Sequence, residues 1–501
     1  MNQQTRWSQF GVLVSVFFFW GFVAASNDIL IPVFKEKLNL TQGQSQLVAV
    51  AFYVAYTVGA LIYNGVSGLL GGDLLNRIGY KNGIALGLVI SALGTLLFYP
   101  AANNASFGLM LSGLFIVGLG FSLQQTAANP LAIVMGDPRT GSQRLSMAGG
   151  VNNFGTTIGP LLVSFAIFGS VTASSGVADI SAVKTPYLIL GALFILVAII
   201  FKVSSVPNKI DLDTETKSDV DLADSRVATP TDIAQPAALS GRRSALSYGQ
   251  LALGMVAIFL YVGVEVSTAS NLPEFMKQHV AGTDGRPFPT ERIAPFVSLF
   301  WASLMMGRWT ASVGAFGVGA GAKSVLRFIM PYLAFGVFLL VNKIANHDIT
   351  PFYVYAVVIL ALIIGDLLSR GNPARQLLIF SLLGITALII GMLADGMVSV
   401  YAFISVGLFC STLWPCIFTL AIAGLGRHTN KGSSFLIMMI MGGGLVAGLQ
   451  GWLAGSEHLG IQLSYVVGVA CFAYLAFYAV RAKAILKGQG IDYDVTQSGG
   501  H

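Results

Sequence analysis

The residues best suited to do chemistry are polar side chains set within long apolar segments. Residues 123–130 read Leu-Gln-Gln-Thr-Ala-Ala-Asn-Pro and lie between apolar stretches on both sides. In the hydrocarbon core of a bilayer a polar group without a partner costs several kcal/mol. This segment is therefore expected to face a protein interior or a water-filled cavity, which predicts a pathway for a solute.

The polar groups of this segment suit a neutral, hydroxyl-rich solute. Gln125 and Asn129 are four residues apart and project from the same helix face. Pro130 has no N–H for the carbonyl of Thr126, which leaves that oxygen for a side chain, a water or a ligand. Further candidates for binding the solute are Gln124, Asn152, Asn153, Glu265 and Asn271.

Aromatic side chains add a second kind of contact. Trp20, Tyr261, Trp301 and Trp414 can stack on the apolar face of a sugar ring. Each can equally be a packing residue of the core or part of a headgroup belt. We count Trp414 among the candidates for substrate binding.

Two carboxyl groups lie deep in apolar segments. Asp28 lies about 17 residues into the first segment, and Glu265 is at a comparable depth in the seventh. A low-dielectric cavity favours the protonated form of a carboxyl group, so each can bind a proton on one side and release it on the other. Both are candidates for proton coupling, and the alternative is a structural carboxylate satisfied by hydroxyls or amides.

Arg308 lies within the eighth segment. An unpaired buried guanidinium is costly, so it either pairs with one of these acids or reaches to the membrane edge. We expect Arg308 to act in gating, the opening and closing of the pathway. The three cysteines fall in apolar segments without metal-binding spacing, and no metal or cofactor is expected.

Composition predicts an all-α protein that crosses the membrane many times. The chain has 501 residues, of which 55% are hydrophobic and 10% charged. About 20 apolar residues are needed to cross a bilayer as a helix. About fourteen spans are predicted, near 10–32, 46–71, 82–101, 107–135, 145–170, 186–205, 249–273, 293–315, 326–343, 351–368, 375–394, 400–425, 433–455 and 462–481.

The distribution of charge predicts the orientation. With a cytoplasmic N-terminus, about 20 Lys and Arg lie in inner loops and tails against about 7 outside. Both termini are then cytoplasmic, in a bacterial inner membrane. Basic residues are thinly scattered without interleaved aromatics, so nucleic-acid binding is not expected.

Four regions are predicted along the chain. They are a six-helix half at 1–206, a polar cytoplasmic linker at 207–247, a second half at 248–490 and a tail at 491–501. Asn129-Pro130 in the fourth span and Trp414-Pro415 in the twelfth suggest two related halves. On that correspondence the second half holds a surplus helical pair at 326–368.

A loop after the second span carries candidate latch residues. Residues 72–81 read Gly-Asp-Leu-Leu-Asn-Arg-Ile-Gly-Tyr-Lys, which resembles the major-facilitator loop signature with Asn76 in place of the usual Asp. Asp73, Arg77 and Lys81 suit a latch between helices at the inner face.

The chain as a whole resembles the fucose/hexose:proton symporter branch of the major facilitator superfamily. The resemblance rests on Asn27-Asp28, on the motif at 125–130, on Asn152-Asn153-Phe154-Gly155 and on Gly442-Gly443-Gly444. It implies two six-helix halves, alternating access, a solute bound between the halves and a protonatable Asp28. Asn27 joins the substrate-binding candidates. A monomer in the lipid bilayer is expected.

Gln125 departs from the fucose transporters of this branch, which have a Glu there. The paired glutamines and the surroundings of Glu265 resemble the glucose/galactose members instead. We therefore expect a hexose or N-acetylhexosamine carried with a proton, with sodium as a possible coupling ion.

Two other function classes remain open. A drug or metabolite:proton antiporter is suggested by fourteen spans and by Gly155-Thr-Thr-Ile-Gly-Pro160, although no Arg lies in the fourth span. A non-transporting sensor or scaffold with the same fold is the other. An enzyme is not expected, because no catalytic or phosphate-binding motif emerges.

Overall fold

The computed structural model describes residues 5–37, 42–168, 184–209, 244–280, 288, 292–455 and 457–494. For the helical residues 24–37, 42–49, 160–161 and 163–168 it describes the backbone alone. Within these ranges the chain is helical and contains no strand. The expected all-α class is confirmed for this part of the chain.

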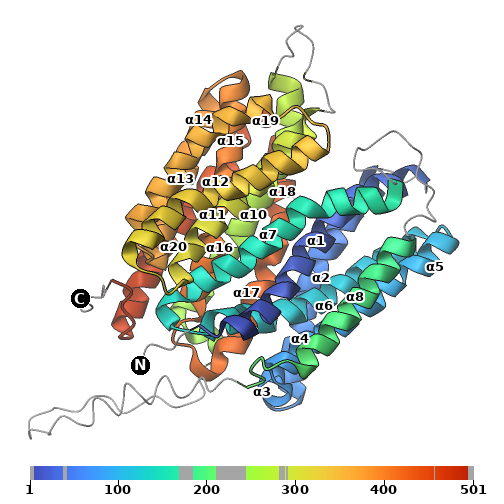
Figure 1. The fold of residues 1–501 in the computed structure, drawn as a ribbon, viewed down its shortest axis with the longest axis vertical. Helices are drawn as coiled ribbons and strands as arrows, with labels where there is room; N and C mark the ends of the chain where they lie inside the picture. Colours follow the sequence, from blue (N-terminus) through green and yellow to red (C-terminus); the bar gives the residue numbers. More distant parts are fainter. Residues whose placement is uncertain are drawn as a thin grey trace, which may run out of the picture.

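Among its described residues, the first half has six long helices and two short ones. Helix α1 packs on α7, α2 on α6, and α4 on both α6 and α8 (Figure 1). The helices are α1 (Trp7–Lys37), α2 (Gln42–Leu69), α3 (Leu74–Ile78), α4 (Tyr80–Leu96), α5 (Phe98–Asn103), α6 (Phe107–Val134), α7 (Gly141–Phe168) and α8 (Lys184–Val203).

The second half has more helices. They are α10 (Gly249–His279), α11 (Ala294–Ser312), α12 (Ala320–Ile344), α13 (Tyr355–Ser369), α14 (Pro373–Leu393), α15 (Gly396–Cys410), α16 (Leu413–Ile422), α17 (Thr429–Met438), α18 (Gly442–Leu453), α19 (Gly460–Leu463) and α20 (Val466–Gly488). Single 3₁₀ turns are η1 (Pro138–Thr140), η3 (Ala245–Ser247), η5 (Val313–Ala315), η6 (Thr350–Val354), η7 (Gly426–His428) and η8 (Met439–Met441).

Helix pairings in the second half repeat those of the first. Helix α10 packs on α18 as α1 packs on α7, and α14 packs on α20 and α15 as α4 packs on α8 and α6. Helix α11 then corresponds to α2. Helices α12 and α13 have no counterpart in this scheme, and they pack against α11 and α14. The pairing supports an inserted pair at 326–368, and the division into domains remains a prediction.

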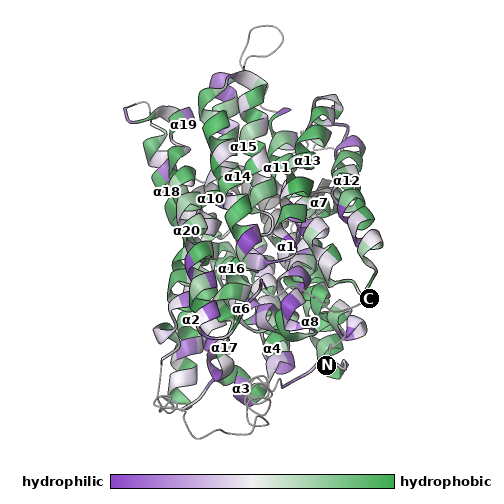
Figure 2. Ribbon diagram, turned by 90° about the vertical axis from the view of Figure 1, so that its left-hand side faces the viewer, coloured by the Kyte–Doolittle hydropathy of each residue, from purple (hydrophilic) through white to green (hydrophobic). Residues whose placement is uncertain are grey.

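Eleven of the described helical segments are long and apolar enough to cross a membrane. Helices α1, α7 and α11 are not among them. Adding these three gives the predicted fourteen, and that count remains a prediction. Most helices carry many hydrophobic residues (Figure 2), and a large number of their large apolar side chains are exposed, as lipid contact requires.

Two long spans of the second half are not continuous α-helices. The predicted twelfth span is divided at Ser411 and Thr412 into α15 and α16, and η8 separates α17 from α18. Pro415 explains the first break, because a proline cannot donate a hydrogen bond to the carbonyl four residues earlier. In α6 the helix continues through Pro130.

We call the end of the bundle that carries residues 204–209 and 244–248 the linker end. Its elements are tied together there, since Lys81 Nζ donates to the carbonyl of Ser204 at 3.1 Å and Gln250 exchanges amide hydrogen bonds with Gln489 at 3.1 and 3.0 Å. The chain after α20 folds back onto this end as far as the structure describes it.

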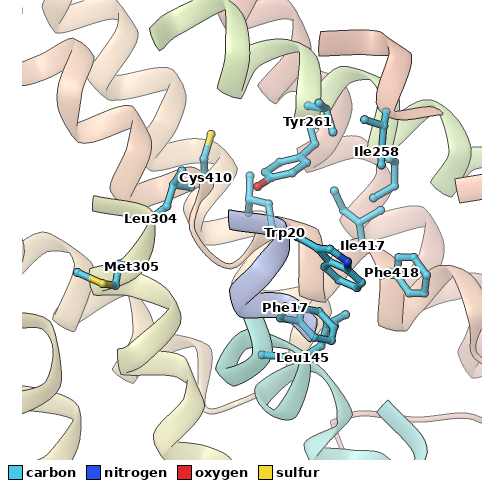
Figure 3. Close-up of a cluster of buried hydrophobic side chains, with 14 of the residues drawn as sticks. Phe17, Trp20, Leu145, Ile258, Tyr261, Leu304, Met305, Cys410, Ile417 and Phe418 are labelled. Carbon is cyan, nitrogen blue, oxygen red and sulfur yellow. The ribbon is translucent and has the colours of Figure 1, made fainter. Parts of the chain in front are cut away.

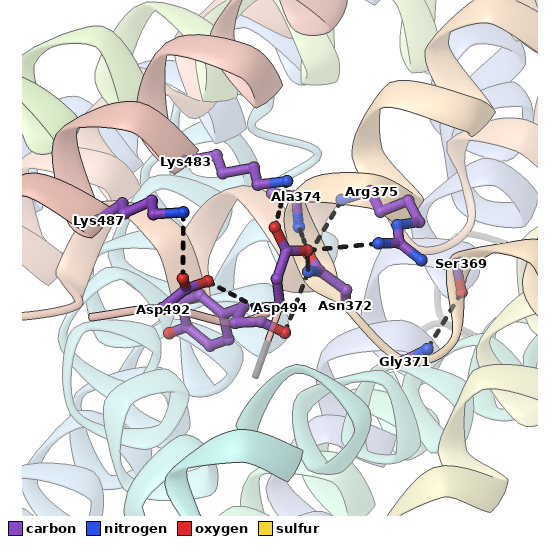
Figure 4. Close-up of polar contacts among 10 residues, drawn as sticks. Ser369, Gly371, Asn372, Ala374, Arg375, Lys483, Lys487, Asp492 and Asp494 are labelled. Carbon is purple, nitrogen blue, oxygen red and sulfur yellow. Dashed lines mark hydrogen bonds and ion pairs between the residues drawn. The ribbon is translucent and has the colours of Figure 1, made fainter. Parts of the chain in front are cut away.

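This returning segment, residues 489–494, is held by charge (Figure 4). Asp494 pairs with Lys483 at 2.5 Å and with Arg375 at 3.3 Å, and it accepts a hydrogen bond from Asn372 Nδ2 at 2.9 Å. Asp492 pairs with Lys487 at 3.5 Å. Asn372 also caps α14 through the N–H groups of residues 374 and 375, so the segment braces the start of that helix.

We expect Asp494→Asn to lower the thermal midpoint of the detergent-solubilised protein by a few degrees. The Lys483 ammonium lowers the pKa of Asp494, so its contribution is present above the ordinary pKa of an aspartate and is lost as pH falls through the lowered value. The difference between wild type and variant should shrink on acidification and with added salt, in thermal scans. Asp492→Asn, with a longer contact, is the matched control; an equal effect of both variants would contradict the assignment.

Candidate functional site

The carbonyl that Pro130 leaves without a donor is used by the other half of the protein. Ser433 Oγ on α17 donates to the carbonyl of Thr126 on α6 at 2.9 Å. Both residues are buried. From the sequence, the partner of this carbonyl could be a side chain, a water or a ligand. In the structure it is a side chain about three hundred residues away in sequence.

The second half contains a matching arrangement. Pro415 leaves the carbonyl of Ser411 without its helical donor, and Arg308 Nε on α11 donates to that oxygen at 3.0 Å. Gly307 makes the approach possible, because a Cβ there would lie 1.8 Å from Ser411 Oγ. The proline-freed carbonyl thus fixes one side of the Arg308 guanidinium.

The remaining Arg308 donors bind acceptors in both halves. Nη1 donates to Asn153 Oδ1 at 2.7 Å and to the carbonyl of Gly149 at 3.3 Å, both on α7, and Nη2 donates to the Tyr261 hydroxyl at 3.3 Å. Arg308 is 8% exposed. The guanidinium is therefore buried between the halves. Of the two alternatives for this residue, the structure favours the counter-charge over a side chain that reaches to the membrane edge.

Glu265 is the acid that faces this guanidinium. Its carboxyl group interacts electrostatically with Arg308 and with the Tyr261 hydroxyl. Tyr261 and Glu265 are four residues apart on α10, so they share a helix face. From the sequence, this four-residue spacing could have indicated that Tyr261 lies next to Glu265. We considered Tyr261 there only as a ring that stacks on a sugar or packs in the core.

The paired glutamines differ in their surroundings. Gln124 is fully buried, accepts from Trp20 Nε1 at 2.9 Å and donates to Ser91 Oγ at 3.0 Å. Both ends of its amide are engaged, so in this state it orients the Trp20 ring. Gln125 is partly exposed and donates to the Tyr56 hydroxyl at 2.9 Å. Nothing in the sequence pointed to Tyr56.

The other amide candidates are also placed. Asn129 is 1% exposed, and its Nδ2 has no partner among the described residues, which leaves a buried donor for a ligand. Asn152 donates to the carbonyl of Phe17 at 3.0 Å. Asn271 donates to Ser267 O in its own helix at 2.9 Å. Asn27 and Asp28 fall within α1, but their side chains lie outside the described residues.

Buried apolar and aromatic residues from both halves form one cluster (Figure 3). Phe17 and Trp20 of α1 lie beside Ile417 of α16, with Tyr261 close to them. The rings of Tyr261 and Trp414 are 6.2 Å apart. A ring next to amide donors is the combination that binds the apolar face and the hydroxyls of a sugar.

At the linker end a buried amide joins the halves. Asn430 at the start of α17 is fully buried; its Nδ2 donates to Asp73 Oδ1 at 3.0 Å and to Asn76 Oδ1 at 2.8 Å, and its Oδ1 accepts from the Tyr80 hydroxyl at 2.5 Å. Tyr63 adds a second hydrogen bond to Asp73 at 2.8 Å. Asp73 is therefore part of a contact between the halves, and the latch role expected for it remains a prediction.

Arg77 and Lys81 stay within the first half. Arg77 is exposed and donates to the carbonyl of Leu70, and Lys81 donates to Ser204. Arg77 therefore braces the loop after α2, and Lys81 ties the start of α4 to the end of α8. The second-half residue of the latch, Asn430, was missed because its partner lies some 350 residues earlier in the sequence.

Further hydrogen bonds between the halves lie in the same region. Thr57 donates to the carbonyl of Met438 at 3.2 Å, Asn64 to Ser434 Oγ at 2.9 Å, and Trp309 Nε1 to the carbonyl of Gly150 at 3.2 Å. The halves are thus joined from Arg308 to the linker end in the part of the chain that the structure describes.

We expect Asn430→Ala to loosen the linker end. The variant removes the Asn430 partner of the Tyr80 hydroxyl and of Asn76 Oδ1, at a cost of about 1–3 kcal/mol, while Asp73 keeps its hydrogen bonds from the Asn76 N–H and from Tyr63. Spin labels on cysteines introduced at Arg139 and Ser324, which are exposed on opposite halves, should give a longer or broader distance distribution. The native cysteines are buried and should label little. Arg77→Ala is the control and should leave the distances unchanged; equal distances in Asn430→Ala would refute the latch.

A double-mutant cycle tests the proline-freed carbonyl. Ser433→Ala should cost about 1 kcal/mol in the wild-type background. In Pro130→Ala a helical N–H becomes available to Thr126, so the same substitution should cost less. Thermal unfolding in detergent measures both, and strictly additive effects would show that the two residues are independent.

Comparison with known proteins gives the family. Residues 11–342 match the family model described as Major Facilitator Superfamily. A glucose/galactose transporter of Brucella abortus is 32% identical over 472 residues, covering 93% of this chain and 92% of that one. An L-fucose-proton symporter of Escherichia coli is 26% identical over 486 residues, covering 94% and 92%.

A solved structure supports the same assignment. The crystal structure of a major facilitator superfamily transporter, FucP, in the outward conformation aligns with a TM-score of 0.68 at 25% identity, covering 94% of this chain and 98% of that one. The fold and these relatives are those of transporters and not of enzymes. The resemblance expected from the motifs is confirmed: the chain belongs to the major facilitator superfamily.

Proposed function

We propose that this protein imports a neutral sugar, a hexose or N-acetylhexosamine, together with a proton by alternating access. The observation that carries the proposal is the set of amides and aromatic rings between the two halves beside the acid–guanidinium pair of Glu265 and Arg308. Neutral amides match sugar hydroxyls, and the acid offers a site for a proton. Relatives named for glucose/galactose and for L-fucose–proton transport support the same substrate class.

The proposed binding groups lie on both halves. Gln125, Asn129 and Asn152 supply amides from the first half, and Glu265 and Trp414 contribute from the second. Gln124 orients Trp20, as its two hydrogen bonds indicate. Asn27, Asn153 and Asn271 complete the proposed set.

Proton coupling is assigned to Asp28 and Glu265. Gln125 cannot titrate, so the acid must lie elsewhere. One proton entering down a potential of 100 mV supplies about 2.3 kcal/mol, enough to concentrate a neutral sugar about fifty-fold. Sodium coupling is the alternative to be tested in the same experiment.

The closed linker end fits an outward-facing state. The distribution of Lys and Arg favours a linker end and two termini that lie on the cytoplasmic side of a bacterial inner membrane. Contacts at Asn430 and Arg308 then block the way to the cytoplasm, and they must break for the solute to leave.

Uptake into proteoliposomes tests this function. Labelled glucose, galactose, N-acetylglucosamine and L-fucose are offered with an imposed pH gradient, a sodium gradient or neither. We expect accumulation of a hexose or N-acetylhexosamine driven by the pH gradient. Glu265→Gln and Asp28→Asn should each lower gradient-driven accumulation at least tenfold, because one coupled proton accounts for about fifty-fold.

Glu274→Gln is the matched control, since this acid lies on the same helix but is exposed, and it should transport normally. Accumulation driven only by the sodium gradient would show that the coupling ion is sodium and not a proton. Failure of all four sugars to enter would overturn the assignment of a sugar carrier, and full accumulation by both site variants would overturn the assigned coupling residues.

A further inference from the structure

Arg308 is a buried cation whose hydrogen-bond partners are neutral. Its acceptors are the carbonyls of Ser411 and Gly149, the Asn153 amide and the Tyr261 hydroxyl. A buried guanidinium without a carboxylate is costly. The acid that balances it, Glu265, acts through the Tyr261 hydroxyl and through space.

The guanidinium is shared between the two halves. Ser411 and Tyr261 hold it from the second half, while Gly149 and Asn153 hold it from the first. The shortest of these contacts, 2.7 Å, crosses the interface to Asn153. Any change in how strongly the second half attracts the guanidinium therefore changes the strength of the Arg308–Asn153 contact between the halves.

The charge of Glu265 determines the strength of this attraction. An ionised carboxylate can accept a hydrogen bond from the Tyr261 hydroxyl and attracts the guanidinium toward α10, in competition with Asn153. A protonated carboxyl group no longer attracts it, and Arg308 then satisfies its charge with the oxygens of α7. Protonation should strengthen the contact between halves, and ionisation should weaken it.

We propose that Arg308 is a positioning residue that transmits the protonation state of Glu265 to the contact between the halves, with Asn153 as the acceptor it shares with the sugar. The inference deepens the proposed function and rests on it. A carrier with a proton but no sugar is held closed at the linker end by Arg308 and Asn153. A sugar hydroxyl that binds Asn153 Oδ1 competes for that acceptor and releases Arg308, so that the loaded carrier can open.

This arrangement gives a rule for coupling. The proton enters from the outer solution, resides on the Glu265 carboxyl group and leaves to the inner solution after the linker end opens. Without sugar the protonated carrier does not open, which prevents a proton leak. The empty, ionised carrier has the weaker contact and can return.

Few other ionisable groups face Glu265. Those that act on it among the described residues are Tyr261 on its own helix, Arg308 on α11 and Cys410 on α15. Cys410 is fully buried in the wall of the same site. A pH dependence that requires both Glu265 and Arg308 can therefore be assigned to this pair.

The test uses the label pair at positions 139 and 324 in full-length protein without sugar, at a series of pH values. In wild type the closed distance should gain population as pH falls, and Glu265→Gln should be closed at every pH. Arg308→Gln should lose the pH dependence. Trp309→Phe is the matched control, because it removes the neighbouring hydrogen bond between halves, to Gly150, but does not touch Glu265; its pH profile should keep the wild-type shape.

Proton leak without sugar gives a second readout. In proteoliposomes with an imposed pH gradient, Arg308→Gln and Asn153→Ala should leak protons about tenfold faster than wild type, as expected for the loss of a charge-assisted hydrogen bond. Trp309→Phe should not leak. If Arg308→Gln fails to fold, Asn153→Ala together with Glu265→Gln still tests the inference: the added Asn153→Ala should open the linker end that Glu265→Gln alone keeps closed.

The outcomes separate this inference from the proposed function. Wild type that carries sugar with protons, combined with an Arg308→Gln variant that keeps the pH profile and does not leak, overturns the inference alone. A Glu265→Gln protein that remains open at every pH also overturns it. Absence of sugar-dependent proton uptake in wild type overturns the proposed function itself.

Discussion

Two missing backbone donors organise the middle of this bundle. Pro130 and Pro415 each leave the carbonyl four residues earlier without its helical hydrogen bond, at positions where no lipid group can replace it. Ser433 satisfies the first and Arg308 the second. Because Ser433 belongs to the other half, and Arg308 itself reaches the other half, satisfying the backbone also joins the halves.

The two solutions differ in kind, and the difference matters for function. Ser433 makes a neutral contact whose strength does not depend on pH. Arg308 brings a charge into the interface, and a buried charge responds to any nearby acid. Glu265 and Tyr261 stand beside it on the second half, while the amides of the first half are neutral. The groups that we propose to bind sugar and the acid that we propose to bind the proton thus lie on facing sides of one contact.

Much of the fold could be predicted from recurring features of the sequence. Apolar segments of about 20 residues and the charge distribution gave an all-α membrane protein, and the positions of Pro130 and Pro415 indicated related halves. The helix pairing supports that correspondence and sets α12 and α13 apart. The break between α15 and α16 was not predicted, since Pro130 at the matching position leaves α6 continuous. A proline permits a break, but its neighbours decide whether one occurs.

The sequence by itself determined which groups are costly to bury: the amides of the fourth span, Glu265, Arg308 and the two proline-freed carbonyls. Their cost in an apolar medium depends on local chemistry, so a linear reading can find them. Only the tertiary structure decided how they are satisfied. Asn430 meets Asp73 and Arg308 meets Asn153 because helices distant in sequence lie side by side, and the free energy of such contacts depends on distances that no local pattern encodes.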